Sequence, residues 1–124
     1  MSNEFGKFIK EKRTGKALSM RIFANLTKES VAYVSSIENG RRTAPSETVL
    51  ERFADVLCLS NKERFYMFDL AAKSKAKPTL ATDLVTYINE NKHIRDVLRL
   101  SKELNVESSD WENFMKVIEC KYLK

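Results

Sequence analysis

The apolar residues in the first half of the chain recur with the spacing of amphipathic helices. Phe5, Phe8 and Ile9 stand at positions i, i+3 and i+4, which predicts a first helix that ends at Gly15. Further apolar stripes in residues 46–72 predict a fourth and a fifth helix. No long run of residues alternates strictly between apolar and polar, as a strand would. The pattern therefore favours an all-α fold.

Two short helices separated by a tight turn are predicted between the first helix and the fourth. Ser19 and Ser30 are the expected N-cap residues of these two helices. Helices joined by a tight turn must cross closely, so the first needs a small residue at the contact, which Ala24 provides. Val34 and Ile37 are expected to face back into the core. The segment therefore has the pattern of a helix-turn-helix.

The outer face of the second of these helices carries small side chains. If Val34 and Ile37 point inward, the residues left facing outward are Val31, Ala32, Ser35 and Ser36. An exposed helix of this kind fits the major groove of B-DNA, where base edges can be read. The pattern therefore indicates DNA binding.

Residues 74–78 are the predicted linker between two parts of the chain. The stretch KSKAKP around them has three lysines, one proline and no large apolar residue. It separates an expected DNA-binding domain at residues 1–73 from an expected helical extension of about three helices at residues 79–124. Two S-x-x-E patterns predict capping boxes, Ser60 with Glu63 for the fifth helix and Ser109 with Glu112 for the last.

Aromatic residues follow the apolar stripe of the last predicted helix. Trp111, Phe114 and Tyr122 stand at helical spacing and must be covered. Two interpretations stay open at this point. The stripe packs on the fifth helix and completes one core, or it forms a surface for a second copy or another protein partner.

The basic residues are concentrated in the first part of the chain. The 124 residues carry a net charge of +5. Residues 1–77 hold 15 Lys and Arg against 9 Asp and Glu, whereas residues 78–124 hold 7 against 8. A basic part joined to a near-neutral part places any contact with a polyanion in the first part.

No arrangement of residues in the sequence indicates catalysis or metal binding. The only histidine is His93, and Cys58 and Cys120 lack the paired spacing of a zinc site. We therefore expect no catalytic residues, no metal, no cofactor and no enzyme activity. No apolar run approaches the roughly 18–20 residues that span a bilayer, so no membrane association is expected. Two isolated thiols fit a reducing cytoplasm.

Several residues at fixed offsets resemble the phage-repressor-like (XRE) family of helix-turn-helix regulators. The resemblance covers residues 5–72 and implies a five-helix lambda-repressor-like DNA-binding domain. The corresponding positions in this chain are Leu18-Ser19-Met20, Ala24, Ser30, Ile37-Glu38-Asn39-Gly40, Arg41-Arg42 and Pro45-Ser46.

Some positions depart from the pattern of that family. Met20 replaces the usual Gln or Glu, and Lys28 replaces the glycine of the turn. A left-handed Lys28 costs about 1 kcal/mol. Val31 and Ala32 replace polar base-reading residues, and they can contact thymine methyl groups but cannot form bidentate bonds to bases. Specificity is then expected to depend more on DNA shape and on the polar residues nearby.

The resemblance implies a sequence-specific regulator of transcription that binds double-stranded DNA. We expect a repressor, bacterial or phage-derived, cytoplasmic and nucleoid-associated, that acts as a homodimer on a palindromic operator. The residues expected to read bases are Ser30, Val31, Ala32, Ser35, Ser36 and Asn39. The residues expected at DNA phosphates are Met20, Arg21, Lys28, Arg41 and Arg42. Glu38 is expected to bridge to an arginine within the domain. The alternative is an antitoxin-like or adaptor protein whose C-terminal helices bind a protein partner.

Overall fold

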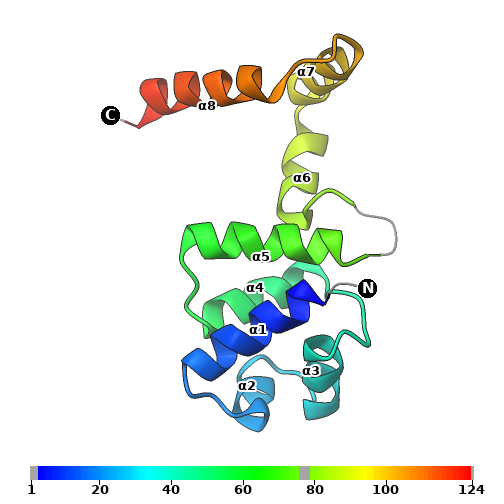
Figure 1. Cartoon of the computed structure of the whole chain (residues 1–124), viewed down its shortest axis with the longest axis vertical. Coiled ribbons are helices and arrows are strands. Elements are labelled where there is room, and N and C mark those ends of the chain that lie inside the picture. The colour runs from blue at the N-terminus through cyan, green and yellow to red at the C-terminus, as the bar shows by residue number, and fades with distance from the viewer. Residues whose placement is uncertain (1–2, 76–78, 124) are drawn as a thin grey trace. The chain divides into compact units, whose positions relative to one another are not determined.

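The computed structural model describes residues 3–75 and 79–123, and within these residues every regular element is a helix (Figure 1). The described residues form five helices and then three more, which confirms the predicted all-α fold. Residues 76–78 of the predicted linker lie outside the described residues. The helices are α1 (Glu4–Gly15), α2 (Met20–Leu26), α3 (Val31–Glu38), α4 (Glu47–Val56), α5 (Asn61–Lys73), α6 (Thr82–Glu90), α7 (Lys92–Glu103) and α8 (Ser108–Tyr122).

The chain forms two compact units, Met1–Thr86 and Tyr87–Lys124. The division falls within α6, later in the sequence than the expected boundary at residues 74–78. Ala81, which precedes α6, is buried in the apolar cluster of the first unit. Because Ala81 packs in this cluster, the first unit extends beyond the fifth helix.

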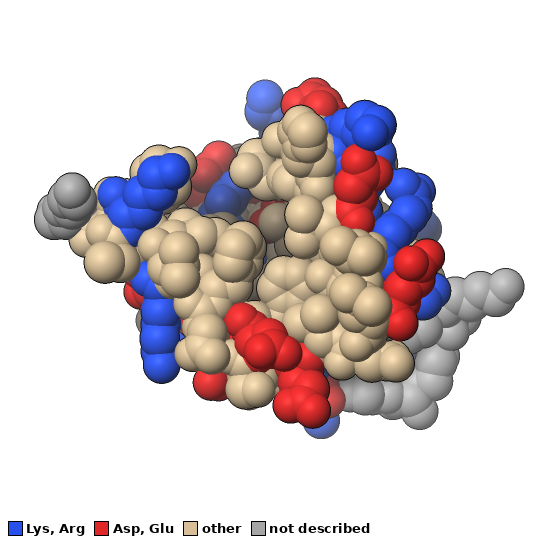
Figure 2. Space-filling model, turned by 90° about the horizontal axis from the view of Figure 1, so that it is seen from above, with Lys and Arg blue, Asp and Glu red and all other residues tan. Residues whose placement is uncertain are grey.

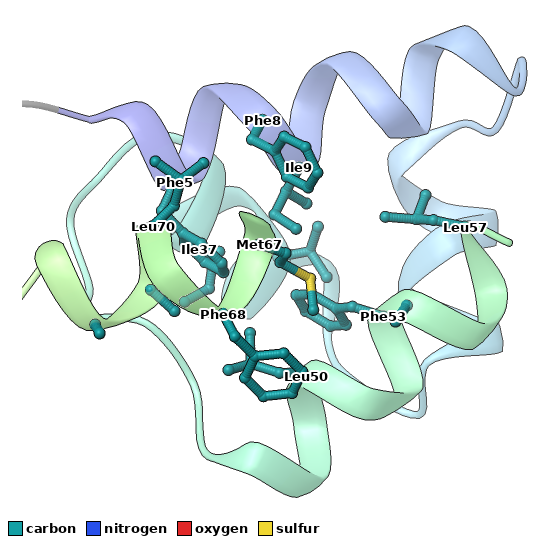
Figure 3. Close-up of a cluster of buried hydrophobic side chains, with 14 of the residues drawn as sticks. Phe5, Phe8, Ile9, Ile37, Leu50, Phe53, Leu57, Met67, Phe68 and Leu70 are labelled. Carbon is teal, nitrogen blue, oxygen red and sulfur yellow. The ribbon is translucent and has the colours of Figure 1, made fainter. Parts of the chain in front are cut away.

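The first unit has one apolar core, built from the inward stripes of its five helices (Figure 3). The largest completely buried side chains include Phe23, Phe53 and Phe68. The rings of Phe23 and Phe53 pack with their centroids 5.1 Å apart, which joins α2 to α4. α1 contacts α3 and α5, and α2 contacts α3. These contacts fix the helix-turn-helix segment against the rest of the unit.

Side-chain caps begin three of the helices where the sequence predicts them. The hydroxyl oxygens of Ser19 and Ser30 each accept a hydrogen bond from the backbone N–H three residues later, at 3.1 and 3.0 Å. Ser60 and Glu63 form the predicted capping box, with bonds of 3.2 and 3.0 Å. Each cap satisfies backbone donors that have no partner within the helix.

The sequence predicts that Gly15 closes the first helix, but the left-handed residue at the end of α1 is a different one. α1 ends at Gly15, but the left-handed residue after the helix is Ala17, with φ 57°. The N–H groups of Ala17 and Leu18 donate to the carbonyls of Thr14 and Arg13, at 2.9 and 3.2 Å. These two bonds form a Schellman motif, in which the left-handed position is two residues beyond the glycine.

The capping box predicted at Ser109 and Glu112 is wrong. α8 already begins at Ser108, and the Asp110 carboxylate accepts the backbone N–H of Glu107 at 3.2 Å. α7 ends at Glu103, and Asn105, which follows it, is left-handed with φ 53°. Glu107 takes the N-cap position of α8, so Ser109 lies inside the helix.

The second unit lacks buried side chains in its described part. No described residue of α7 or α8 is buried. Trp111 and Phe114 of α8 make an edge-to-face contact, with ring centroids 6.1 Å apart. These two rings and Val97 of α7 line two shallow hollows of about 210 and 310 Å³. None of the described helices is long and apolar enough to cross a membrane.

Candidate nucleic-acid interface

α3 presents its first turn to solvent and buries its opposite face. Val34 and Ile37 are 0% and 1% exposed, as the sequence predicts. Val31 and Ala32 are exposed, and Val31 retains 44% of its accessible surface. An apolar side chain this exposed at the start of a helix is available for contact with another molecule.

The polar side chains near the C-terminal end of α3 are engaged in local hydrogen bonds. Ser35 and Ser36 are half-buried, and the Ser36 hydroxyl donates to the carbonyl of Tyr33 at 2.7 Å. The exposed Asn39 donates from its side-chain amide to the Ser35 hydroxyl at 3.2 Å. The hydroxyls of Ser35 and Ser36 are therefore engaged locally, whereas Asn39 is exposed.

The turn between α2 and α3 is held by a residue that the sequence does not single out. Lys28 is left-handed, with φ 62°, the conformation expected at the position of the turn glycine. Arg52 of α4 donates to the carbonyl of Thr27 at 3.0 Å and pairs with the Glu29 carboxylate at 2.8 Å. Arg52 resembles any polar residue on the outer face of α4, so only the tertiary structure reveals this role.

A buried ion pair connects α1 to the end of α3. Arg13 and Glu38 form two parallel bonds, of 2.7 and 3.0 Å, and their side chains are 9% and 2% exposed. The third nitrogen of Arg13 donates to the carbonyl of Leu18 at 2.8 Å. This pair confirms that Glu38 bridges to an arginine within the domain. A bidentate geometry fixes the orientation of the two helices as well as their distance.

Comparison with known proteins identifies the family. A sequence model described as a helix-turn-helix domain matches residues 4–65, which is half of the chain. The chain belongs to this helix-turn-helix family. Membership confirms the resemblance drawn from the sequence and identifies the chain as a DNA-binding regulator.

One solved structure is similar to this helix-turn-helix regulator over nearly the whole chain. A chain in a solved complex of the SinR and SinI proteins is similar, with a TM-score of 0.49 and 20% sequence identity. The alignment covers 97% of this chain and 99% of that chain. No curated protein matches the sequence.

The helix-turn-helix regulator carries unpaired cations on the segments that flank α3. Arg21, Lys28 and Arg41 are exposed and form no ion pair with any described residue. Some cations of the first unit are paired, for example Arg64 with Glu51, whereas others, such as the exposed Lys62 of α5, form no ion pair with a described residue. Cations without a protein partner are the ones available to phosphate groups.

Arg42 is placed differently from its neighbour Arg41. Its guanidinium lies 5.2 Å from the centre of the Tyr33 ring, which orients it over α3. Burial and, to a lesser degree, the Glu29 carboxylate raise the pKa of Tyr33. Because the phenol stays neutral at physiological pH, it supports Arg42 without neutralising its charge.

Met20 lies apart from the other residues expected at phosphates. Its side chain is half-buried and packs against the apolar core. A thioether donates no hydrogen bond, so a phosphate contact at this position requires the backbone N–H at the start of α2. The assignment of Met20 stays a prediction.

Proposed function

We propose that this regulator is a repressor that binds a palindromic operator as a homodimer and inserts α3 into the major groove. The observation that carries the proposal is the exposed first turn of α3 flanked by the unpaired cations Arg21, Lys28 and Arg41. Apolar side chains there suit thymine methyl groups, and the cations suit phosphates on either side of the groove. The proposed base-reading residues are Ser30, Val31, Ala32, Ser35, Ser36 and Asn39, and the proposed phosphate contacts are Met20, Arg21, Lys28, Arg41 and Arg42.

The two groups of residues predict different effects on DNA binding. The substitution Arg41→Ala should weaken binding to all sequences similarly and reduce the slope of log affinity against log salt by about one unit. The substitution Ala32→Ser should change which bases are preferred and leave the salt slope unaltered. Titration of labelled duplexes at several salt concentrations measures both effects.

Lys62→Ala is the matched control because it removes one exposed positive charge from α5. In Figure 1, α5 lies on the side of the first unit opposite to α2 and α3. If Lys62→Ala reduced the salt slope as much as Arg41→Ala, the cations near α3 would have no special role. The assignment of the interface would then fail.

The proposed dimer contact involves α7 and α8. Trp111, Phe114 and Tyr122 are 37%, 51% and 70% exposed. In the view of Figure 2, residues other than Lys, Arg, Asp and Glu lie together between charged residues. Large exposed apolar surfaces are uncommon on monomeric proteins, which supports coverage by a second chain. We also propose that residues 79–124 act as the dimerisation extension and residues 74–78 as the linker.

Dimerisation has a direct consequence for affinity. A single helix-turn-helix reads one half-site, whereas two recognition helices about 34 Å apart read both halves of a palindrome. The substitution Phe114→Asp in the full chain should therefore produce monomers in sedimentation experiments and weaken operator binding about 100-fold or more. If the variant sedimented as the wild type does and bound DNA equally well, α8 would serve another partner, as in the adaptor alternative.

The repressor role predicts the sign of regulation. A reporter gene placed behind the operator and its promoter should be transcribed more strongly when Arg41→Ala replaces the wild-type chain. Lower transcription with this variant would indicate an activator instead.

A further inference from the structure

We propose that Asn3 is a positioning residue for the DNA contacts at the C-terminal end of α3. This inference rests on the proposed function, because Asn39 and Arg41, which follow α3, are among the proposed DNA contacts. Asn3 lies at the start of α1, far from these residues in the sequence. Its side-chain amide donates to the backbone carbonyl of Glu38 at 2.9 Å.

The Asn3 side chain does not have the usual role of an asparagine at a helix start. Asn3 is the N-cap residue of α1, and its backbone carbonyl accepts the N–H of Lys7 at 3.0 Å. An asparagine in this position normally accepts a backbone N–H of its own helix with its side chain. In this chain the side chain makes no such bond. The amide is directed to α3 instead.

The bond completes the hydrogen bonding of the last turn of α3. A helix leaves its last four carbonyls without partners inside the helix. The carbonyls of Ser35, Ser36 and Ile37 accept the backbone N–H groups of residues 39–42, at 2.9–3.3 Å. The carbonyl of Glu38 is the remaining one, and Asn3 satisfies it.

Two glycines allow α1 and α3 to approach closely enough for this bond. A Cβ atom on Gly6 would lie 2.6 Å from the carbonyl oxygens of Ile37 and Glu38 and would also clash with Asn3 Oδ1. A Cβ atom on Gly40 would lie 2.8 Å from Asn3 Cγ, and Gly40 is left-handed with φ +75°. The Asn3 amide therefore packs between two backbone segments that have no room for side chains.

Glu38 is thus held by α1 at two points. Asn3 binds its main-chain carbonyl, and Arg13 binds its carboxylate. The residue after Glu38 is Asn39, which lines the same small hollow of about 130 Å³ as Asn3 and Arg42. Loss of the Asn3 bond frees the final carbonyl and lets the Asn39–Arg42 segment move relative to α3.

The test is the substitution Asn3→Ala in the chain of 124 residues. We expect operator binding to weaken about three- to tenfold, which corresponds to the net contribution of one hydrogen bond. Discrimination should fall at the base pair that Asn39 contacts and persist at the base pair that Ala32 contacts. In the background of Asn39→Ala, the substitution at Asn3 should have little further effect on affinity, because both changes act on the same contact.

The control is Thr14→Ala on the same helix. The Thr14 hydroxyl is exposed and bonds only to carbonyls of α1, for example that of Lys10 at 2.9 Å. A merely structural role of Asn3 would lower the melting temperature and leave base discrimination unchanged, and that result would overturn the inference. Additive effects of the Asn3 and Asn39 substitutions would also overturn it.

A second variant covers the case in which Asn3→Ala does not fold. Asn3→Asp keeps the shape of the side chain but replaces the amide donor with a carboxylate, which repels the Glu38 carbonyl. The same loss of discrimination is expected, and wild-type discrimination in a folded Asn3→Asp variant would contradict the inference. If the wild-type chain itself bound no duplex DNA, the proposed function would fail instead.

Discussion

The two units of the chain use the same kind of helix in different ways. In Met1–Thr86, each of the five helices buries residues such as Ile9, Phe53 and Phe68 in a common core. In Tyr87–Lys124, α7 separates polar from apolar residues clearly, yet no described residue of it is buried. An amphipathic pattern therefore predicts a helix in both units, but it does not reveal what covers the apolar face.

Ion pairs of the first unit connect segments far apart in the sequence, whereas the described ion pair of the second unit lies within one helix. In the first unit, Arg13–Glu38 and Arg52–Glu29 connect residues that are 25 and 23 positions apart. In the second unit, Lys92 and Asp96 form an exposed pair within one turn of α7. Ion pairs between helices fix a tertiary arrangement, whereas a pair within one helix supports only that helix.

The sharpest test of this comparison is removal of one ring from each unit. Phe53→Ala should lower the free energy of unfolding by about 3–5 kcal/mol, because the side chain is 0% exposed and leaves a cavity. Phe114→Ala, at 51% exposure, should cost less than about 1 kcal/mol in dilute solution. Urea denaturation followed by circular dichroism measures both values. Equal losses would show that the second unit has a core of its own.

The next largest effect is expected from the buried ion pair. Arg13→Met leaves the Glu38 carboxylate buried without a partner and should cost about 3 kcal/mol. Lys92→Met breaks the exposed pair on α7 and should cost about 0.3 kcal/mol. Replacing both Arg13 and Glu38 by apolar residues should restore much of the stability. A double variant that is less stable than Arg13→Met would contradict this account.

A smaller loss of stability is expected at the turn between α2 and α3. Arg52→Lys retains the charge but cannot reach both the Thr27 carbonyl and the Glu29 carboxylate with one planar group. We expect a loss of about 1 kcal/mol in unfolding free energy. Hydrogen exchange of the Lys28 and Glu29 amides should become faster. Unchanged exchange at these two amides would show that the turn does not depend on α4.

The smallest effect concerns Glu63, which pairs with Lys12 and caps α5. The hydrogen bonds from Lys12 and from Ser60 lower the pKa of Glu63 from 4.5 to about 2. Because the pKa is lower in the folded chain, the stabilisation is present above pH 4.5 and is lost as the pH falls toward 2. Glu63→Gln should flatten the dependence of stability on pH in this range, as measured by thermal unfolding. An unaltered profile would exclude Glu63 as a source of that dependence.

Local signals in the sequence predicted much of the fold. The caps at Ser19, Ser30 and Ser60 depend on residues within one turn of each other, so their patterns are visible in the sequence. The capping box predicted at Ser109 failed because Glu107 and Asp110, two residues earlier in the sequence, take these positions at the start of α8.

The details of the interface were less predictable. Val31 and Ala32 are exposed as expected, whereas Ser36 directs its hydroxyl to its own helix. The bonds from Arg52 and Asn3 join segments far apart in the sequence. Such contacts follow from the packing of helices and carry no local pattern.

Selection of bound duplexes from a random DNA pool by the intact chain tests the central claim most directly. The account predicts enrichment of an inverted repeat whose half-sites are centred about one helical turn apart, because two copies of α3 enter adjacent major grooves on one side of the duplex. Substitution of Val31 or Ala32 should then alter the enriched bases within each half-site. Failure to retain any duplex at low salt, or enrichment unchanged by either substitution, would contradict the assignment of α3 as the recognition helix.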